Sequence, residues 1–473
     1  MNKNLLKLFF SSGVQAISVQ VLGVAFFLIM LLVMPKEDFG IINWANAVAV
    51  TLTIALSFGM DQIVLRRISA SGTSDWAAGA FFFHSVIGSV ATFLILWLCT
   101  GLFSNVSNAG FYVLPWFFAA QAIIAIANPF KQYLNAKQDF TPYAIIAVVA
   151  NVIKLVLAYV VIKAGVLTIQ YVYLILIGCA LLELIALLAY VKHKKLSFNF
   201  RWSAYIKLIK ESFPQYIATI FDSSLSRIDW ILIGIISTNA VTADYSSAYR
   251  AYEMTRLPLT ILAPIILGIF AKMFVNNKRI DTNKVKDIND LFTVEIFFAM
   301  LLPLTLNILW SPVMDSISHG KYGSVNHTQF LILSICIPFQ FFINILWSLG
   351  FSSRHYKPIS IIIGSTAVLN LLLNLFMIPF WGGEGAAIAY LVTTVVQLVL
   401  YYILVRNRIM KFSYLSFIKL LIIGTAAYLV SVQFVADTVL RLLCAVGLYL
   451  VVCFASRTVT KNEIGKTMAL LKK

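Results

Sequence analysis

The chain has few charged residues. Only 12% of its 473 residues are Asp, Glu, Lys or Arg, against roughly 25% in an average soluble domain. Hydrophobic residues make up 60% of the chain, and the mean hydropathy is +0.89. This composition excludes an ordinary soluble domain and predicts an all-α polytopic membrane protein.

Several sequence motifs are absent, and each absence excludes a class of function. The five cysteines show no CxxC or Cys/His spacing, so we expect small packing residues and no metal site. No Gly-rich lysine motif is present, and the longest expected connections, 16 to 21 residues, are too short for a nucleotide-binding or glycosyltransferase domain. We therefore expect no enzyme activity and no cofactor. No small-residue cleavage site follows the first apolar stretch, which predicts a retained signal anchor.

Long apolar runs dominate what is there. A span of about 20 apolar residues crosses a hydrocarbon core of about 30 Å, and we count fourteen such runs. A re-entrant bend near Asp437 is an alternative for the last pair. The predicted spans are 12–34, 40–60, 76–99, 108–128, 142–162, 168–191, 213–236, 245–271, 291–310, 328–350, 358–379, 384–405, 415–435 and 438–456.

The basic residues predict the orientation. When both termini are cytoplasmic, 28 Lys and Arg residues fall on the cytoplasmic side and 4 on the opposite side. The net charge of +17 is thus explained mostly by the basic residues on the cytoplasmic side of the membrane. We expect no nucleic-acid partner, whereas the basic loops suit contact with anionic membrane lipids.

Two consecutive spans, 213–236 and 245–271, carry charges that lipid-facing helices lack. Each ionisable side chain near the bilayer centre costs roughly 2.5 to 3.5 kcal/mol on insertion scales, so these groups should face a cavity or one another. We expect the solute pathway here. The charged residues are Asp222, Arg227 and Asp229 in the first span and Arg250, Glu253 and Arg256 in the second.

Two arrangements of these charges stay open. One is a closed ion-pair network between the two helices, which serves folding alone. The other, which we prefer, is a cavity with surplus Arg, because guanidinium groups bind phosphate in a bidentate way. Asp229 and Glu253, with Asp222 in reserve, are then the candidates for coupling to a proton or sodium ion, since burial and a nearby Arg shift the pKa of a carboxyl in opposite directions.

Further basic residues are weaker candidates for substrate binding. Lys154 lies within an apolar span, where it either lines the cavity or bonds to neighbours such as Asn151. Glu183, in the next span, is too different in depth for an easy ion pair with Lys154. Arg66 and Arg67 follow the second span at its cytoplasmic end. They either fix the orientation of the span or bind an anionic headgroup as it enters.

The connection 192–212 divides the chain. It carries six basic residues, and its second half, IKLIKESF, alternates like an interfacial amphipathic helix. DFGIINWANA at 38–47 and DYSSAYRAYE at 244–253 enter corresponding spans, which predicts a parallel repeat about an axis along the membrane normal. We expect a lobe at 1–200, a second lobe at 201–406, and two additional helices with a cytoplasmic tail at 407–473.

Three stretches carry a family resemblance over most of the chain. These are FGIINWANAVAV, which begins at Phe39, the segments RIDWILIG and DYSSAYRAYEM, and LNLLLNLFMIPFWGGEGAAIAYLV, which begins at Leu369. They resemble the polysaccharide transporter branch of the multidrug/oligosaccharidyl-lipid/polysaccharide (MOP) exporter superfamily. The resemblance implies two six-helix lobes in a V, with helices 1, 2, 7 and 8 lining a cationic cavity. Fourteen spans depart from the twelve that many members have.

The resemblance also implies a function. Such proteins are flippases that carry a polyprenyl-diphosphate-linked oligosaccharide, for O-antigen, capsule or another surface polysaccharide, to the outer leaflet of a bacterial inner membrane by ion-coupled alternating access. Contact with the polysaccharide assembly machinery is a further expectation. The alternatives are a multidrug or organic-cation antiporter of the same superfamily and a membrane glycan polymerase or ligase. Surplus Arg disfavours the first, and short outer connections disfavour the second.

Overall fold

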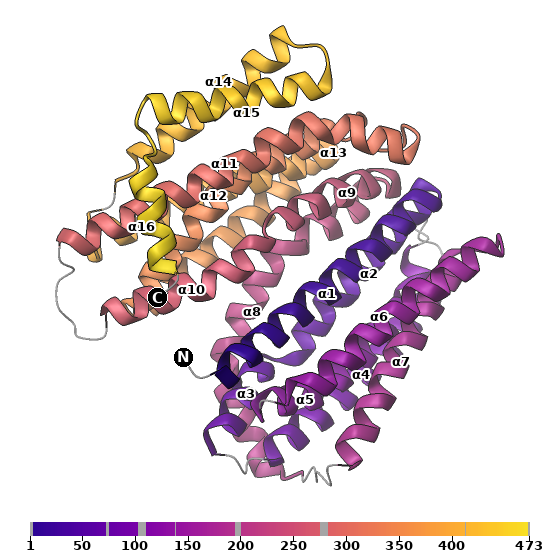
Figure 1. The fold of residues 1–473 in the computed structure, drawn as a ribbon. Coiled ribbons are helices and arrows are strands. Elements are labelled where there is room, and N and C mark those ends of the chain that lie inside the picture. Colours follow the sequence, from indigo (N-terminus) through magenta and orange to yellow (C-terminus); the bar gives the residue numbers. More distant parts are fainter. Residues whose placement is uncertain are drawn as a thin grey trace. The chain divides into compact units, whose positions relative to one another are not determined.

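The structure is a computed structural model of the 473-residue chain (Figure 1). It describes residues 3–71, 75–102, 110–137, 139–193, 200–274, 282–411 and 413–471. Within these ranges the side chains of residues 3–17 and of some others, including Asp222, lie outside the description. Residues 194–199 of the predicted connection 192–212 lie outside it as well.

Helices make up the described chain, which contains no strand in these ranges. Helix is the conformation that satisfies every backbone hydrogen bond within one apolar segment. The helices are α1 (Lys3–Val33), α2 (Lys36–Ser57), α3 (Met60–Ser71), α4 (Asp75–Leu102), α5 (Gly110–Ala136), α6 (Phe140–Lys163), α7 (Ile169–His193), α8 (Trp202–Ile236), α9 (Asn239–Thr255), α10 (Leu257–Phe274), α11 (Thr282–Ser318), α12 (His327–Ser352), α13 (Tyr356–Arg408), α14 (Leu415–Phe434), α15 (Thr438–Ala455) and α16 (Lys461–Leu471).

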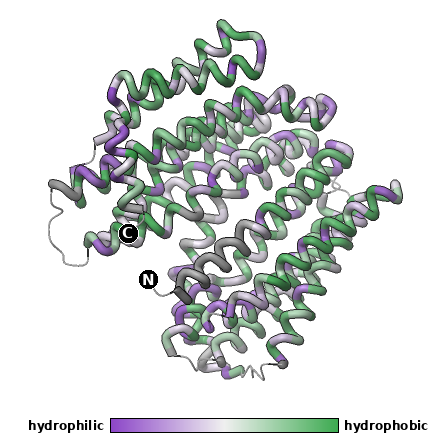
Figure 2. Tube along the Cα trace, viewed as in Figure 1, coloured by the Kyte–Doolittle hydropathy of each residue, from purple (hydrophilic) through white to green (hydrophobic). Residues whose placement is uncertain are grey.

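Eleven described helical stretches are long and apolar enough to cross a membrane. Each of the fourteen predicted ranges overlaps a described helix, and α13 alone contains two of them, 358–379 and 384–405. The all-helical class is therefore confirmed, whereas the count of fourteen stays a prediction. Figure 2 shows hydrophobic residues along most of each long helix, with hydrophilic residues concentrated near helix ends.

The chain forms two compact units, Met1–Ala243 and Asp244–Lys473. In the first unit, α5 contacts α2, α4 and α7, and α1 lies along α6 (Figure 1). Helix α8 packs against α2, α3 and α4, so it belongs to this unit. Residues 206–213, predicted as an interfacial helix, are the beginning of α8. The repeat boundary near residue 200 stays a prediction.

Helices α2 and α8 approach each other closely through the 38–47 motif. The buried Trp44 ring lies over Gly234, where any larger side chain would collide with the indole. Trp44 Nε1 donates to the carbonyl oxygen of Ile231 at 3.1 Å. Gly40 faces the backbone of Asn239 so closely that a Cβ has no room. Small residues at such positions allow membrane helices to pack closely, and this explains why the motif combines Gly with Trp.

In the second unit, α12 packs between α11 and α13 and also contacts α10, while α14, α15 and α16 contact α11. Helix α13 is a hairpin, because its residue Gly382 has φ 53° and ψ −127°. Asn370 Nδ2 donates to Thr393 Oγ1 at 3.4 Å, and Gln397 Nε2 donates to Thr366 Oγ1 at 3.5 Å, so the two arms lie side by side. The two predicted spans are its arms.

Candidate functional site

The second predicted charged span is broken at Arg256. Helix α9 ends at Thr255 and α10 begins at Leu257. Pro258 explains the break, since proline lacks the N–H that would continue the hydrogen bonds of α9, and its ring clashes with the carbonyl four residues before it. Tight turns close it: Arg256 N donates to the carbonyl oxygen of Glu253 at 3.1 Å, and Leu259 N donates to that of Arg256 at 2.9 Å. Arg256 is therefore presented at a helix break.

The Arg256 guanidinium lies half-buried over an aromatic ring. Its Cζ is 5.9 Å from the centroid of the Tyr252 ring, a cation–π distance. Arg256 forms no ion pair with a carboxylate among the described residues of its unit. A ring compensates the cation less completely than a carboxylate does, so the guanidinium keeps donors for an anion.

A buried polar network supports this ring. The hydroxyls of Tyr252 and Tyr390 are 3.1 Å apart, which joins α9 to α13. Gln340 Nε2 of α12 donates to the Tyr390 hydroxyl at 3.4 Å and to Thr394 Oγ1 at 3.5 Å. The network fixes the Tyr252 ring and thereby the surface on which Arg256 rests.

Arg250 is arranged differently from Arg256. Its NH1 is 2.7 Å from Glu253 Oε2, one helical turn further along α9. Both side chains are about one quarter exposed, at 27% and 23%. Arg250 and Glu253, three residues apart, thus share one face of α9. Each neutralises the other within one helix, so a second helix is not needed to compensate them.

The charged residues of α8 lie in the first unit. Arg227 Cζ is 5.8 Å from the centroid of the Trp230 ring, and Arg227 forms no ion pair with a described carboxylate of its unit. Asp229 is buried at 1% exposure, and its Oδ1 accepts from the Trp230 backbone N–H at 2.9 Å. The Asp222 side chain lies outside the description. Since α8 and Arg250, Glu253 and Arg256 belong to separate units, a shared cavity between them stays a prediction.

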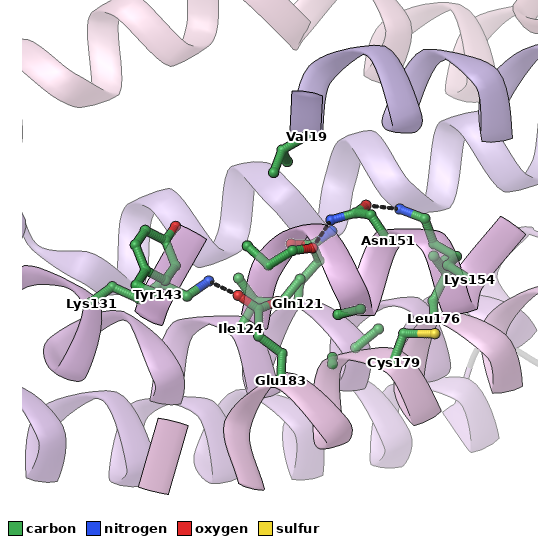
Figure 3. A pocket seen from close by; sticks show the side chains of 14 residues that line it. Val19, Gln121, Ile124, Lys131, Tyr143, Asn151, Lys154, Leu176, Cys179 and Glu183 are labelled. Atoms are coloured by element: carbon green, nitrogen blue, oxygen red, sulfur yellow. Dashed lines mark hydrogen bonds and ion pairs between the residues drawn. The ribbon is translucent and has the colours of Figure 1, made fainter. Parts of the chain in front are cut away.

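A second polar site lies inside the first unit, where α1, α5, α6 and α7 line a cavity of about 260 Å³ (Figure 3). Lys154 is one of its lining residues. Its Nζ donates to Asn151 Oδ1 at 2.7 Å and lies 5.1 Å from the centroid of the Phe26 ring. Asn151 in turn donates to the Ala147 carbonyl at 2.8 Å. Lys154 thus bonds to Asn151, one of its two predicted roles, whereas its place in the transport cavity stays a prediction.

The same cavity contains an ion pair that the sequence analysis missed. Lys131 Nζ is 2.7 Å from Glu183 Oε1, and each side chain is only 13% exposed (Figure 3). Lys131 was assigned to a cytoplasmic loop because the span was expected to end at 128. Helix α5 instead continues to Ala136, which carries Lys131 to the level of Glu183. Two lysines and one glutamate leave this cavity with one net positive charge.

Arg66 and Arg67 lie on α3, where they differ in exposure. Arg66 is exposed, whereas Arg67 pairs with Glu211 of α8. Arg67 Nε donates to Glu211 Oε2 at 2.9 Å, and NH2 donates to Oε1, so the pair is bidentate. Arg67 Cζ also lies 5.1 Å from the centroid of the Trp76 ring. Arg67 thus joins α3 to α8, and Arg66 presents its charge outward.

Metal binding finds no support in the described residues. No group of three or more His, Cys, Asp or Glu in the described part of the chain is placed to hold a metal ion. The five cysteines are free thiols, and Cys179, Cys336 and Cys453 are buried. The guanidinium and ammonium groups of the candidate sites suit binding of an anion.

Comparison with known proteins gives a family and a fold. Residues 5–270 match the family described as "Polysaccharide biosynthesis protein". No curated protein matches this chain by sequence.

Solved structures share the fold. The "Lipid II flippase MurJ, inward closed conformation" is 14% identical with a TM-score of 0.76, over 95% of this chain and 99% of that one. An inward-facing multidrug resistance MATE family transporter of the MOP superfamily is 13% identical with a TM-score of 0.67, over 82% and 94%. A MOP superfamily transporter from Pyrococcus furiosus is 12% identical with a TM-score of 0.57, over 84% and 94%. The chain has the fold of these transporters.

Proposed function

Because the chain belongs to the polysaccharide biosynthesis protein family, as an integral membrane protein with the fold of flippases and transporters, we propose the following function. It carries a polyprenyl-diphosphate-linked oligosaccharide, such as a repeat unit of O-antigen, capsule or another surface polysaccharide, from the cytoplasmic to the outer leaflet of a bacterial inner membrane. Both termini are cytoplasmic in this proposal, fourteen helices span the membrane, and helices 1 to 6 and 7 to 12 form two lobes related by a pseudo-twofold axis.

The Arg256 environment carries the proposal. A half-buried guanidinium without a carboxylate partner in its unit is expensive in a membrane protein unless an anion uses it. Arg227 has a matching arrangement on its own helix, over Trp230. The diphosphate is the strongly charged part of every candidate substrate, and charge-assisted bonds from Arg to phosphate are short and strong. These arginines also disfavour an organic cation as the solute.

The substrate divides among three environments. Arg256 and Arg227 bind the diphosphate, with Arg250 joining when the diphosphate displaces Glu253 from it. The sugar occupies the proposed transport cavity, and the polyprenyl chain stays in lipid. Arg66, exposed on α3, meets the phosphate on entry, and Lys154 extends the cationic lining within the first lobe.

Coupling to an ion gradient rests on the carboxylates. Release of Glu253 from Arg250 by the diphosphate leaves a carboxylate that takes up a proton or a sodium ion. Asp229, buried and capped by a backbone N–H, is the second group that can change its charge, with Asp222 in reserve. A ligand shifts a two-state equilibrium only through its different affinities for the two states, and such a carboxylate provides that difference.

Flipping by purified protein tests the function. We expect proteoliposomes to move a fluorescent undecaprenyl-diphosphate oligosaccharide, and Arg256→Ala to slow the initial rate at least about tenfold, the value of one charge-assisted bond of about 1.5 kcal/mol or more. Arg256→Lys keeps the charge and should lose less. The control is Arg408→Ala, since Arg408 is exposed in the same unit. Wild-type rates in Arg256→Ala would overturn the assignment.

The same vesicles include an arm for coupling. An imposed proton or sodium gradient should accelerate flipping by wild type, whereas Asp229→Asn or Glu253→Gln should bind substrate but respond less to the gradient. An equal response in wild type and both variants would reject these carboxylates as the coupling groups.

A further inference from the structure

The second unit contains an apolar cavity of about 490 Å³ that the proposed transport does not use. It lies where α10, α11 and α12 meet the C-terminal helix α16. Cavities of roughly 300 to 1,000 Å³ are the usual size of small-molecule sites. Its apolar lining includes Leu262, Ile266, Val294, Phe298, Phe341 and Met468.

One carboxyl group lies in this apolar lining. Glu295 of α11 is 8% exposed, and neither of its oxygens has a hydrogen-bond partner among the described residues. Thr467 of α16 also lines the cavity, is 3% exposed, and its Oγ1 has no partner there either. Leaving buried polar groups unsatisfied costs about 1 to 3 kcal/mol for each, and more for a charge. Two such groups around one cavity indicate an occupant that supplies hydrogen-bond donors.

We propose that this cavity binds a lipophilic amine, an apolar chain that ends in a primary ammonium group. The ammonium donates to the Glu295 oxygens and to Thr467 Oγ1, which uses its three N–H donors. The chain lies against the apolar side chains of α10, α11 and α12.

Other ligand classes fit the cavity less well. A phosphate-bearing ligand is disfavoured because no Lys or Arg is among the described lining residues. A divalent metal needs several oxygen ligands, commonly including more than one carboxylate, and Glu295 is the only acid in that lining. The charge of this site is also opposite to that of Arg256, so its ligand differs from the proposed diphosphate substrate.

Calorimetric titration of the full-length protein in phosphatidylcholine nanodiscs tests the site. The probes are n-octylammonium chloride and neutral n-octanol, with empty nanodiscs subtracted. We expect saturable binding of octylammonium to wild type, tighter than that of octanol. Glu295→Gln, which keeps the side-chain shape, should weaken octylammonium at least about tenfold and leave octanol unchanged, because it removes a charge-assisted bond. Glu384→Gln, on an exposed carboxyl of the same unit, is the control and should bind like wild type.

A second variant keeps the test decisive if Glu295→Gln folds poorly. Met468→Trp fills the cavity from α16 and should weaken both probes. Absence of saturable octylammonium binding to wild type overturns the proposal. Equal binding of octylammonium by wild type and Glu295→Gln, or by wild type and Met468→Trp, overturns it as well.

Discussion

The two cavities described above differ in how the glutamate in their lining is compensated. In the first unit, Glu183 is paired with Lys131. In the second unit, Glu295 lies in an apolar lining with no partner among the described residues. Charge that is already compensated supports structure, whereas charge left uncompensated is available to a ligand. The same residue type, Glu, therefore has a structural role in one unit and a proposed binding role in the other.

Removing the paired carboxylate should have the largest effect on stability. Glu183→Ala leaves Lys131, only 13% exposed, without its carboxylate, and breaking a fully buried pair in this way costs about 3 to 5 kcal/mol. We expect a loss near the lower end of that range in the free energy of unfolding, measured by denaturant titration in detergent micelles. The double variant Lys131→Met with Glu183→Met removes both charges and should recover most of the loss. A single variant as stable as wild type would show that the pair contributes little.

The matching change in the second cavity should act in the other direction. Glu295→Met replaces an unsatisfied carboxyl with an apolar group of similar length, so we expect the free energy of unfolding to rise by about 1 kcal/mol. Unfolding of ligand-free protein under the same conditions measures this, with Glu384→Met as the exposed control. A clear loss of stability would mean that Glu295 has a structural partner and would end the contrast between the cavities.

The smallest effect is expected at the partly exposed pair of α3 and α8. The hydrogen bond from Arg67 lowers the pKa of the Glu211 carboxyl, against a smaller opposing effect of burial. A lowered pKa in the folded state means that this stabilisation is complete above the unfolded value of about 4.3 and is lost as the pH falls through the folded value. Glu211→Gln should cost about 0.2 to 1 kcal/mol at pH 7. The difference from wild type should shrink as the pH falls below about 4.3, and a difference that stays constant there would exclude the pair as its cause.

The length of the apolar runs was enough to predict most helices of the fold. A long apolar segment in a membrane must satisfy its backbone hydrogen bonds internally, and a helix does this. Helix ends were predicted less well. We expected one span at 245–271, and Asn239–Phe274 is one candidate membrane span, but a one-residue turn at Arg256, just before Pro258, divides it into α9 and α10. We ended the span 108–128 too early, because α5 continues past Pro129 to Ala136. The hydropathy of a segment depends on its overall composition, and so it predicts that a helix is present. The residue at which the helix ends depends on single residues and on tertiary contacts.

The candidate site was predictable in part. Charges in apolar spans marked Arg227, Arg250 and Arg256 as candidates. Partners distant in sequence were not predictable. Lys131 and Glu183 pair through the packing of α5 on α7. Glu295 lies near the start of the predicted span 291–310, so its charge did not mark it as a candidate. Its proposed binding role follows only from the apolar side chains that surround it in the structure.

The reversal at Gly382 has a consequence for biogenesis. The arms of α13 are joined without a polar loop, since Trp381 and Gly382 already lie in the turn and the exposed rings of Phe380 and Trp381 stand at its tip. Aromatic rings favour the membrane–water interface, so little polar chain has to cross the bilayer with this turn. During synthesis the second arm of α13 follows the first directly after this turn. The two arms should therefore leave the insertion machinery together as one preformed hairpin.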